Sequence, residues 1–84
     1  MKKLTRFTAQ WCQPCQTLKK SLEALDLTDV DVEVIDVDTF DKLKLQNFGV
    51  KGVPTLILQD SEGNELKRKT GSMTPQQLKT WLET

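Results

Sequence analysis

The chain has 84 residues, and its 12 lysine and arginine side chains balance 12 aspartate and glutamate side chains. This length predicts a single domain over residues 1–84, which buries only about 60% of the surface that its unfolded form exposes. Balanced, interspersed charges do not favour nucleic acid or an acidic membrane surface as a partner. The first residues turn polar before a signal-peptide run forms, and no stretch reaches the roughly 18 apolar residues of a membrane span. We therefore expect a soluble, cytoplasmic protein with no membrane partner.

The first part of the chain predicts a strand, a helix and a second strand. Residues 4–8 form a short segment with Thr and Phe that runs into a loop, as a strand does. Over residues 14–26, apolar side chains recur at steps of three and four, which predicts an amphipathic helix. Pro14 suits its first turn, where a missing N–H costs nothing. Over residues 30–37, valines alternate with acidic residues and predict a β-branched strand.

The middle of the chain predicts a helix and a hairpin. Thr39 is expected to cap a helix that runs to about Phe48. Residues 55–58 form a continuous apolar run, which is typical of a strand covered on both faces. Residues 60–64 have the composition of a turn. Residues 65–70 predict a strand rich in lysine and arginine, whose charge protects the edge of a sheet.

The last element is predicted to be a helix with a strong start signal. Thr74 supplies a capping hydroxyl, Pro75 stands at the first helical position and Gln77 at the third. The order is therefore βαβαββα. The first βαβ unit should be a right-handed crossover between parallel strands, and the turn at Gly63 should make the last two strands antiparallel. The sequence predicts an α/β fold with a four-stranded mixed sheet and helices on both faces.

Cys12 and Cys15 are the only cysteines. Two cysteines three residues apart are too few and too close to staple a small secreted domain. A structural zinc site needs four ligands, and the chain has no histidine and no second cysteine pair, so we expect no metal. Cys12 precedes a helix whose free N–H groups and positive dipole end stabilise a thiolate, whereas Cys15 lies on the apolar stripe. Two idle buried cysteines are the alternative, and an exposed Trp11 beside them argues against it.

Several motifs in succession resemble the landmarks of the thioredoxin family. The chain is glutaredoxin-sized, and we expect it to lack the first strand and helix of a full-length thioredoxin. Ala9, where glutaredoxins often carry a basic residue, favours the thioredoxin side, as do the Trp before the first cysteine and the Pro before the second. The motifs are Trp11-Cys12-Gln13-Pro14-Cys15, Asp36-Val37-Asp38, Gly52-Val53-Pro54-Thr55, Gly63 and Gly71.

The resemblance implies a protein-disulfide reductase in which Cys12 is the nucleophile and Cys15 the resolving thiol. It implies a cis Pro54 beside the dithiol and a Val53 backbone that binds an extended substrate strand. The implied partners are disulfide-containing proteins and a thioredoxin reductase or small thiol, with no cofactor and a monomeric chain. The implied substrate-binding residues are Trp11, Gln13, Pro14, Val53, Pro54 and Gly71.

Each of these residues also has a simpler interpretation. Trp11 could be partial core, Pro54 a trans proline at a strand start, and Gly71 a turn glycine. Two other functions stay open. One is a glutaredoxin-like enzyme that uses glutathione, and the other is a thioredoxin-fold binding subunit that does not use its thiols.

The chain departs from the family pattern at three positions. Gln13 stands where typical thioredoxins have glycine, so the redox potential does not follow from the resemblance. Arg6 stands where they hold a buried acid that assists proton transfer, and Val34 replaces the usual lysine neighbour of that acid. We expect Arg6 to reach solvent or to meet Glu33 or Asp36, because an unpaired buried charge is costly.

Overall fold

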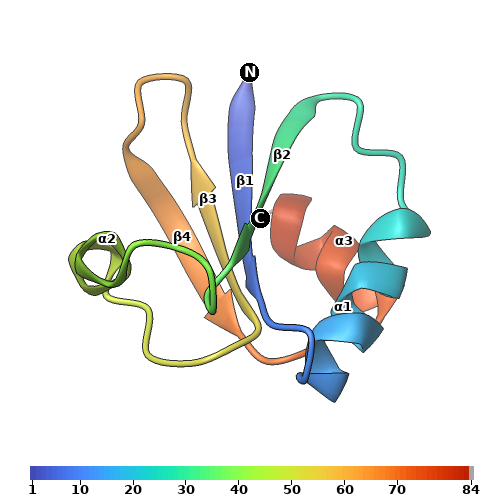
Figure 1. The fold of residues 1–84 in the computed structure, drawn as a ribbon. Coiled ribbons are helices and arrows are strands. Elements are labelled where there is room, and N and C mark those ends of the chain that lie inside the picture. The colour runs from blue at the N-terminus through green and yellow to red at the C-terminus, as the bar shows by residue number, and fades with distance from the viewer. Residues whose placement is uncertain (84) are drawn as a thin grey trace.

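The computed structural model describes residues 1–83, in which seven elements follow the predicted order. The sheet has the order β2-β1-β3-β4, with β1 and β2 parallel and the other neighbours antiparallel. Helices α1 and α3 lie on one face and α2 on the other (Figure 1). The α/β architecture predicted from the sequence is confirmed. The elements are β1 (Lys2–Thr8), α1 (Gln13–Glu23), β2 (Val30–Asp36), α2 (Lys42–Phe48), β3 (Thr55–Gln59), β4 (Glu65–Thr70) and α3 (Pro75–Glu83).

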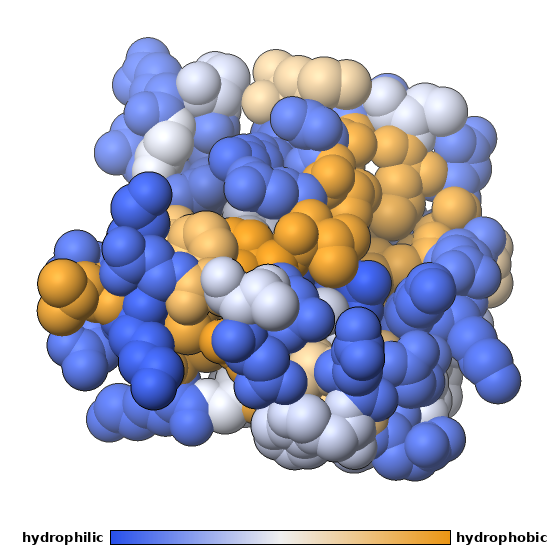
Figure 2. All heavy atoms as spheres, in the orientation of Figure 1, coloured by the Kyte–Doolittle hydropathy of each residue, from blue (hydrophilic) through white to orange (hydrophobic). Residues whose placement is uncertain are grey.

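The two faces of the sheet carry separate apolar clusters, because successive strand side chains point to opposite faces. The cluster under α2 is built on Phe7, Ile35 and Ile57, and the ring of Phe7 meets that of Phe48 edge to face at 5.3 Å. Viewed as in Figure 1, apolar atoms gather across the middle of the molecule and hydrophilic atoms surround them (Figure 2). The buried residues of the cluster under α1 and α3 are Leu4, Leu18, Leu22, Leu56, Leu58, Met73 and Leu78.

The third strand and the last helix form as predicted. Residues 55–58 are all buried, so β3 is covered on both faces. At the start of α3, the backbone N–H of Gln77 donates to Thr74 Oγ1 at 3.1 Å, and the backbone N–H of Thr74 donates to Gln77 Oε1 at 3.0 Å. This reciprocal pair is the predicted capping box. The Ser21 hydroxyl of α1 donates to the Met73 carbonyl at 2.6 Å, which ties α1 to the segment just before α3.

Two predicted helix boundaries are wrong. Helix α1 ends at Glu23 rather than at residue 26, because Leu25 and Leu27 leave the helix and pack against the core from the following loop. The second helix starts at Lys42, not after Thr39. Its cap is Asp41, whose side chain accepts the backbone N–H groups of Leu43 and Lys44.

The hairpin of β3 and β4 also closes as predicted. The Asp60 N–H donates to the Asn64 carbonyl, and Asp60 Oδ1 accepts the backbone N–H groups of Glu62 and Asn64, all at 2.9 Å. The hydrogen bonds that the carboxylate accepts, above all the one from the Asn64 backbone, hold the pKa of Asp60 below its ordinary value because they favour the charged form. Gly63 completes the turn with a φ of 89°, a conformation that favours glycine.

Arg68 connects β4 to the end of α2. Its guanidinium donates to the Phe48 carbonyl at 2.8 Å and to the Gly49 carbonyl at 3.4 Å. It also makes two hydrogen bonds of 2.6 and 2.7 Å to the Glu65 carboxylate, which lower the pKa of Glu65 and raise that of Arg68. Arg68 thereby fixes the start of the loop of residues 49–54, and Val53 near the end of this loop packs against the cysteines.

None of the helices within residues 1–83 is long and apolar enough to cross a membrane.

Replacing Leu18 by alanine should lower the free energy of unfolding by about 2–5 kcal/mol, because Leu18 is fully buried between α1 and the sheet. Leu43→Ala is the matched control, since Leu43 is 70% exposed on α2 and should change stability by no more than about 0.5 kcal/mol. Urea denaturation followed by circular dichroism measures both variants. Equal losses would show that the cluster under α1 does not govern stability.

Candidate active site

The two cysteines lie at the junction where β1 passes into α1. The Cys12 N–H donates to the Ala9 carbonyl at 3.2 Å, which closes a tight turn after the strand. Cys12 is the N-cap of α1, with extended backbone angles, and Pro14 occupies the first turn. The proline is tolerated there because that N–H has no partner within the helix. The sequence prediction that Cys12 immediately precedes the helix is confirmed.

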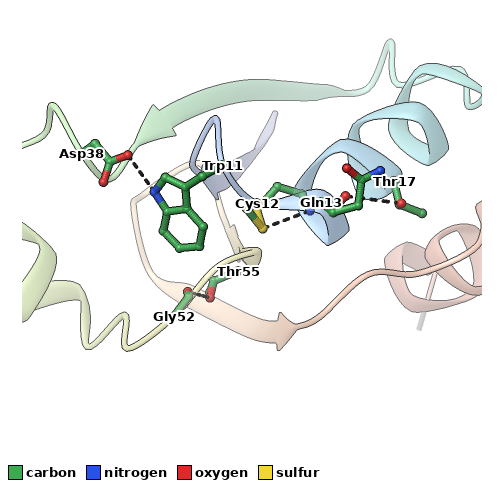
Figure 3. Close-up of a disulfide and its surroundings, with 8 residues drawn as sticks. Trp11, Cys12, Gln13, Thr17, Asp38, Gly52 and Thr55 are labelled. Atoms are coloured by element: carbon green, nitrogen blue, oxygen red, sulfur yellow. Dashed lines mark hydrogen bonds between the residues drawn. A yellow bond between two sulfur atoms is a disulfide. The ribbon is translucent and has the colours of Figure 1, made fainter.

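Cys12 and Cys15 form a disulfide, with their Cα atoms 5.2 Å apart. The backbone N–H of Cys15 donates to Cys12 Sγ at 3.2 Å, so the sulfur takes the place of a capping oxygen (Figure 3). Cys12 is 4% exposed and Cys15 is 0% exposed, which agrees in direction with the predicted order of exposure. An N–H group of the first helical turn is therefore directed at the Cys12 sulfur, where it would stabilise negative charge.

The loop before β3 packs against the disulfide. Val53 contacts the cluster of Ala9, Cys12 and Cys15. The Val53–Pro54 peptide bond is cis, as the family resemblance implied. The Gly71 N–H donates to the Pro54 carbonyl at 3.0 Å, and Gly71 has a φ of 90° that favours glycine. The fold thus brings Val53, Pro54 and Gly71 to the same side as the cysteines, although they lie far apart in sequence.

Trp11 projects from the same junction and is 71% exposed, so its interpretation as partial core is wrong. Its Nε1–H donates to Asp38 Oδ2 at 3.0 Å, and the Asp38 N–H in turn donates to Asp36 Oδ1 at 2.9 Å. Figure 3 shows the indole ring beside Cys12 and turned toward Asp38. The sequence singled out the Asp36-Val37-Asp38 motif but assigned no contact to Asp38.

A hollow of about 250 Å³ lies beside Trp11. Of the predicted substrate-binding residues, Trp11 and Val53 line it, whereas Gln13, Pro14, Pro54 and Gly71 do not. Gln13 and Pro14 are exposed on the first turn of α1, and Pro54 is buried. The sequence analysis missed the other lining residues, because they come from the end of β2, from α2 and from the loop after it, and only the fold brings these segments together. These residues are Val37, Leu45, Val50, Lys51 and Gly52.

Arg6 lies on the face of β1 that packs under α1, and it is 7% exposed. Burial lowers its pKa, and the negative charge of Glu23 on α1 acts in the opposite direction. The expected partners Glu33 and Asp36 are therefore wrong. Glu33 pairs instead with Lys3 at 2.5 Å, and Asp36 accepts the Asp38 N–H. Of the side chains in residues 1–83, no aspartate or glutamate is buried.

Comparison with known proteins identifies the family. The family model described as Thioredoxin matches residues 1–84. The chain is 40% identical to the thioredoxin of Chlamydia muridarum over 70 residues, which span 81% of this chain and 67% of that protein. It is 31% identical to the thioredoxin of Rhodospirillum rubrum over 80 residues, 92% of this chain and 75% of that protein.

Among solved structures, a mutant thioredoxin from Halobacterium salinarum NRC-1 superposes with a TM-score of 0.84 and 37% identity, covering 98% of this chain and 72% of that one. Trxlp from Edwardsiella tarda EIB202 gives a TM-score of 0.85 and 32% identity, covering 96% and 81%. With a Cys-x-x-Cys pair at the start of its first helix and a family match over its whole length, the chain belongs to the thioredoxin family and is a thiol-disulfide oxidoreductase.

Proposed function

We propose that this chain reduces disulfide bonds of cytoplasmic proteins, with Cys12 as the attacking thiolate and Cys15 as the resolving thiol. The observation that carries the assignment is the hydrogen bond from the Cys15 N–H to Cys12 Sγ at the N-cap of α1. A thiolate at this position meets N–H groups and the positive end of the helix dipole. Cys15 meets buried apolar neighbours, which disfavour charge on its sulfur.

The reaction follows from this difference. In the reduced protein, the Cys12 thiolate attacks one sulfur of a substrate disulfide, and a mixed disulfide forms while the other substrate sulfur leaves and takes a proton from water. Cys15 then loses its proton and attacks Cys12 Sγ, which releases the second substrate thiolate. The substrate gains two electrons, and the Cys12–Cys15 disulfide of this structure is the oxidised product. Because Cys15 lies three residues from Cys12, its attack is intramolecular and fast.

The substrate is proposed to bind as an extended segment across the surface of Trp11, Gln13, Pro14, Val53, Pro54 and Gly71. The Val53 backbone can pair with such a segment as a neighbouring strand would. The Thr55 hydroxyl donates to the Gly52 carbonyl at 2.7 Å, which holds the loop just before Val53 (Figure 3). An apolar substrate side chain fits the hollow between Trp11 and Val53.

The proposed partners are disulfide-containing proteins and a thioredoxin reductase or small thiol that regenerates the dithiol of a monomeric chain. Glutathione-dependent chemistry is the second candidate. Rapid reduction of the Cys12–Cys15 disulfide by thioredoxin reductase with NADPH, and slow reduction by glutathione, would support the first candidate. The reverse result would support a glutaredoxin-like enzyme. A cellular function retained by the Cys12→Ser, Cys15→Ser double variant would instead identify a binding subunit.

Cys15→Ser should accumulate a covalent complex with a disulfide-containing protein such as insulin, because the mixed disulfide forms but is not resolved. Cys12→Ser is the matched control and should trap little and reduce nothing. Non-reducing electrophoresis detects the complex, and limiting iodoacetamide followed by mass mapping should label Cys12 first in the reduced protein. Preferential labelling of Cys15 would reverse the assignment.

Arg6→Leu should leave the shape of the pH profile of insulin reduction unchanged, because an arginine stays protonated and exchanges no protons in the active pH range. Without a buried carboxylate in residues 1–83, we propose that Cys15 passes its proton to water. Arg6→Asp should add an inflection, since burial raises the pKa of a carboxylate at this position. An inflection that disappears in Arg6→Leu would contradict the proposal, and circular dichroism checks that both variants fold.

A further inference from the structure

The outer edge of β2 is not paired with another strand of residues 1–83 (Figure 1). In a strand, the N–H and C=O groups of successive residues point to opposite edges. The Val37 N–H donates to the Thr8 carbonyl of β1 at 2.9 Å. The backbone N–H and C=O groups of the odd-numbered residues of β2 therefore point toward β1. The even-numbered residues, Val32 and Val34 among them, therefore turn their backbone groups away from the sheet.

The two ends of this edge are closed by the chain itself. The Val30 N–H donates to the Leu27 carbonyl at 3.3 Å. The Asp36 carbonyl accepts the N–H groups of Thr39 and Phe40 at 3.2 and 3.1 Å. Between these closures, the outward N–H and C=O groups of two residues, 32 and 34, have no hydrogen-bond partner within residues 1–83. This short window is open to one added strand.

The side chains of the window give it two chemically different faces. Val32 is 39% exposed and Val34 is 54% exposed, on the face where Val30 packs against the core under α1. Asp31 and Glu33 lie on the other face, because side chains alternate along a strand. Glu33 is paired with Lys3 of β1 at 2.5 Å, so Asp31 carries the negative charge of this face that a partner can meet. Residues 29–38 contain five acidic side chains and no lysine or arginine. The edge therefore combines unpaired backbone groups, exposed valines and negative charge.

We propose that this edge of β2 binds an extended segment of another protein in which basic side chains alternate with apolar ones. The added strand would pair its backbone with Val32 and Val34, place its apolar side chains beside these valines and set a basic side chain beside Asp31, while Glu33 keeps its ion pair with Lys3 of β1. An alternating segment satisfies this pattern in either strand direction. The edge is separate from the cysteine site, and the proposal does not depend on the roles of Cys12 and Cys15.

A second copy of this chain fits the edge poorly. Pairing β2 with another β2 would set acidic side chains opposite acidic side chains, which is destabilising. The basic strand β4 is the other outer strand, but two of its three cations are already engaged, which leaves only Lys69 to meet an acidic side chain. Lys67 donates to the Trp81 carbonyl and lies over its ring, and Arg68 binds Glu65 and the end of α2. The charge pattern thus favours a partner with free basic side chains.

The test uses a capped peptide of alternating valine and lysine and, as the control, one of alternating valine and glutamate. Binding to the oxidised, isotope-labelled protein is followed by amide NMR and by fluorescence anisotropy of a labelled peptide. The lysine peptide should shift the amide signals of Val32 and Val34 and slow their hydrogen exchange. Its affinity should exceed that of the glutamate peptide by about tenfold and fall as salt is added.

Two variants separate the backbone contribution from the side-chain contribution. Val32→Pro removes one outward N–H without removing a hydrogen bond to β1, and Val34→Lys adds a repelling charge. Each should weaken binding by about tenfold. Leu66→Lys, in the other outer strand and 48% exposed, is the matched control and should bind the lysine peptide as the unmodified chain does. All three should retain insulin reduction, which shows that they fold.

Four results would overturn the proposal. They are no shift of the Val32 and Val34 amides at saturating peptide, equal affinity for the two peptides, equal weakening by Leu66→Lys and Val34→Lys, and a concentration-dependent dimer in sedimentation that Val34→Lys disrupts. The last result would identify a second copy as the occupant of the edge. If Val32→Pro does not fold, Val34→Lys alone decides the side-chain prediction, and the exchange rates of the unmodified chain decide the backbone prediction.

Discussion

The hydrogen bond from the Cys15 backbone to the Cys12 sulfur organises this molecule. It requires a helix to begin where β1 ends, so that a sulfur can take the position of a capping oxygen. That helix must bury its apolar stripe, and the cluster around Leu18 holds it on the sheet. The other face of the sheet is covered by α2, whose following loop returns to the same sulfur through Val53. The environment of the reactive Cys12 sulfur is therefore set by the way in which α1 is capped.

Local signals in the sequence were sufficient for much of this structure. Thr74 and Gln77 form the predicted capping box, because the two partners lie three residues apart and need no tertiary contact. The strand of residues 65–70 has the predicted limits, since turn residues define its start. Thr39 was expected to be the cap of the second helix, whereas Asp41, two residues later, caps it, and an imperfect apolar period did not show where this helix starts. Leu25 continued the predicted helical pattern, but it packs against the core from the loop that follows α1.

What the sequence could not supply is contact across elements. The cysteine pair, the cis Pro54 and the exposed Trp11 followed from short motifs and their family resemblance. The contact of Trp11 with Asp38 joins residues 27 positions apart, and the hollow beside it is lined from three separate segments. For Arg6, the sequence suggested acids on the neighbouring strand, whereas the negative charge it faces comes from Glu23 on the helix above. Such partners depend on packing and not on spacing along the chain.

The contacts of β4 have a consequence for how the molecule opens. Arg68 holds the carbonyl groups at the start of the loop of residues 49–54, and the Gly71 N–H holds the Pro54 carbonyl at its end. Both ends of the loop are thus anchored to the same hairpin. Local opening in proteins occurs in contiguous cooperative units. We therefore expect the loop beside the cysteines to open together with the hairpin, so that β4, at the far edge of the sheet, limits how easily this loop moves away from the sulfur atoms.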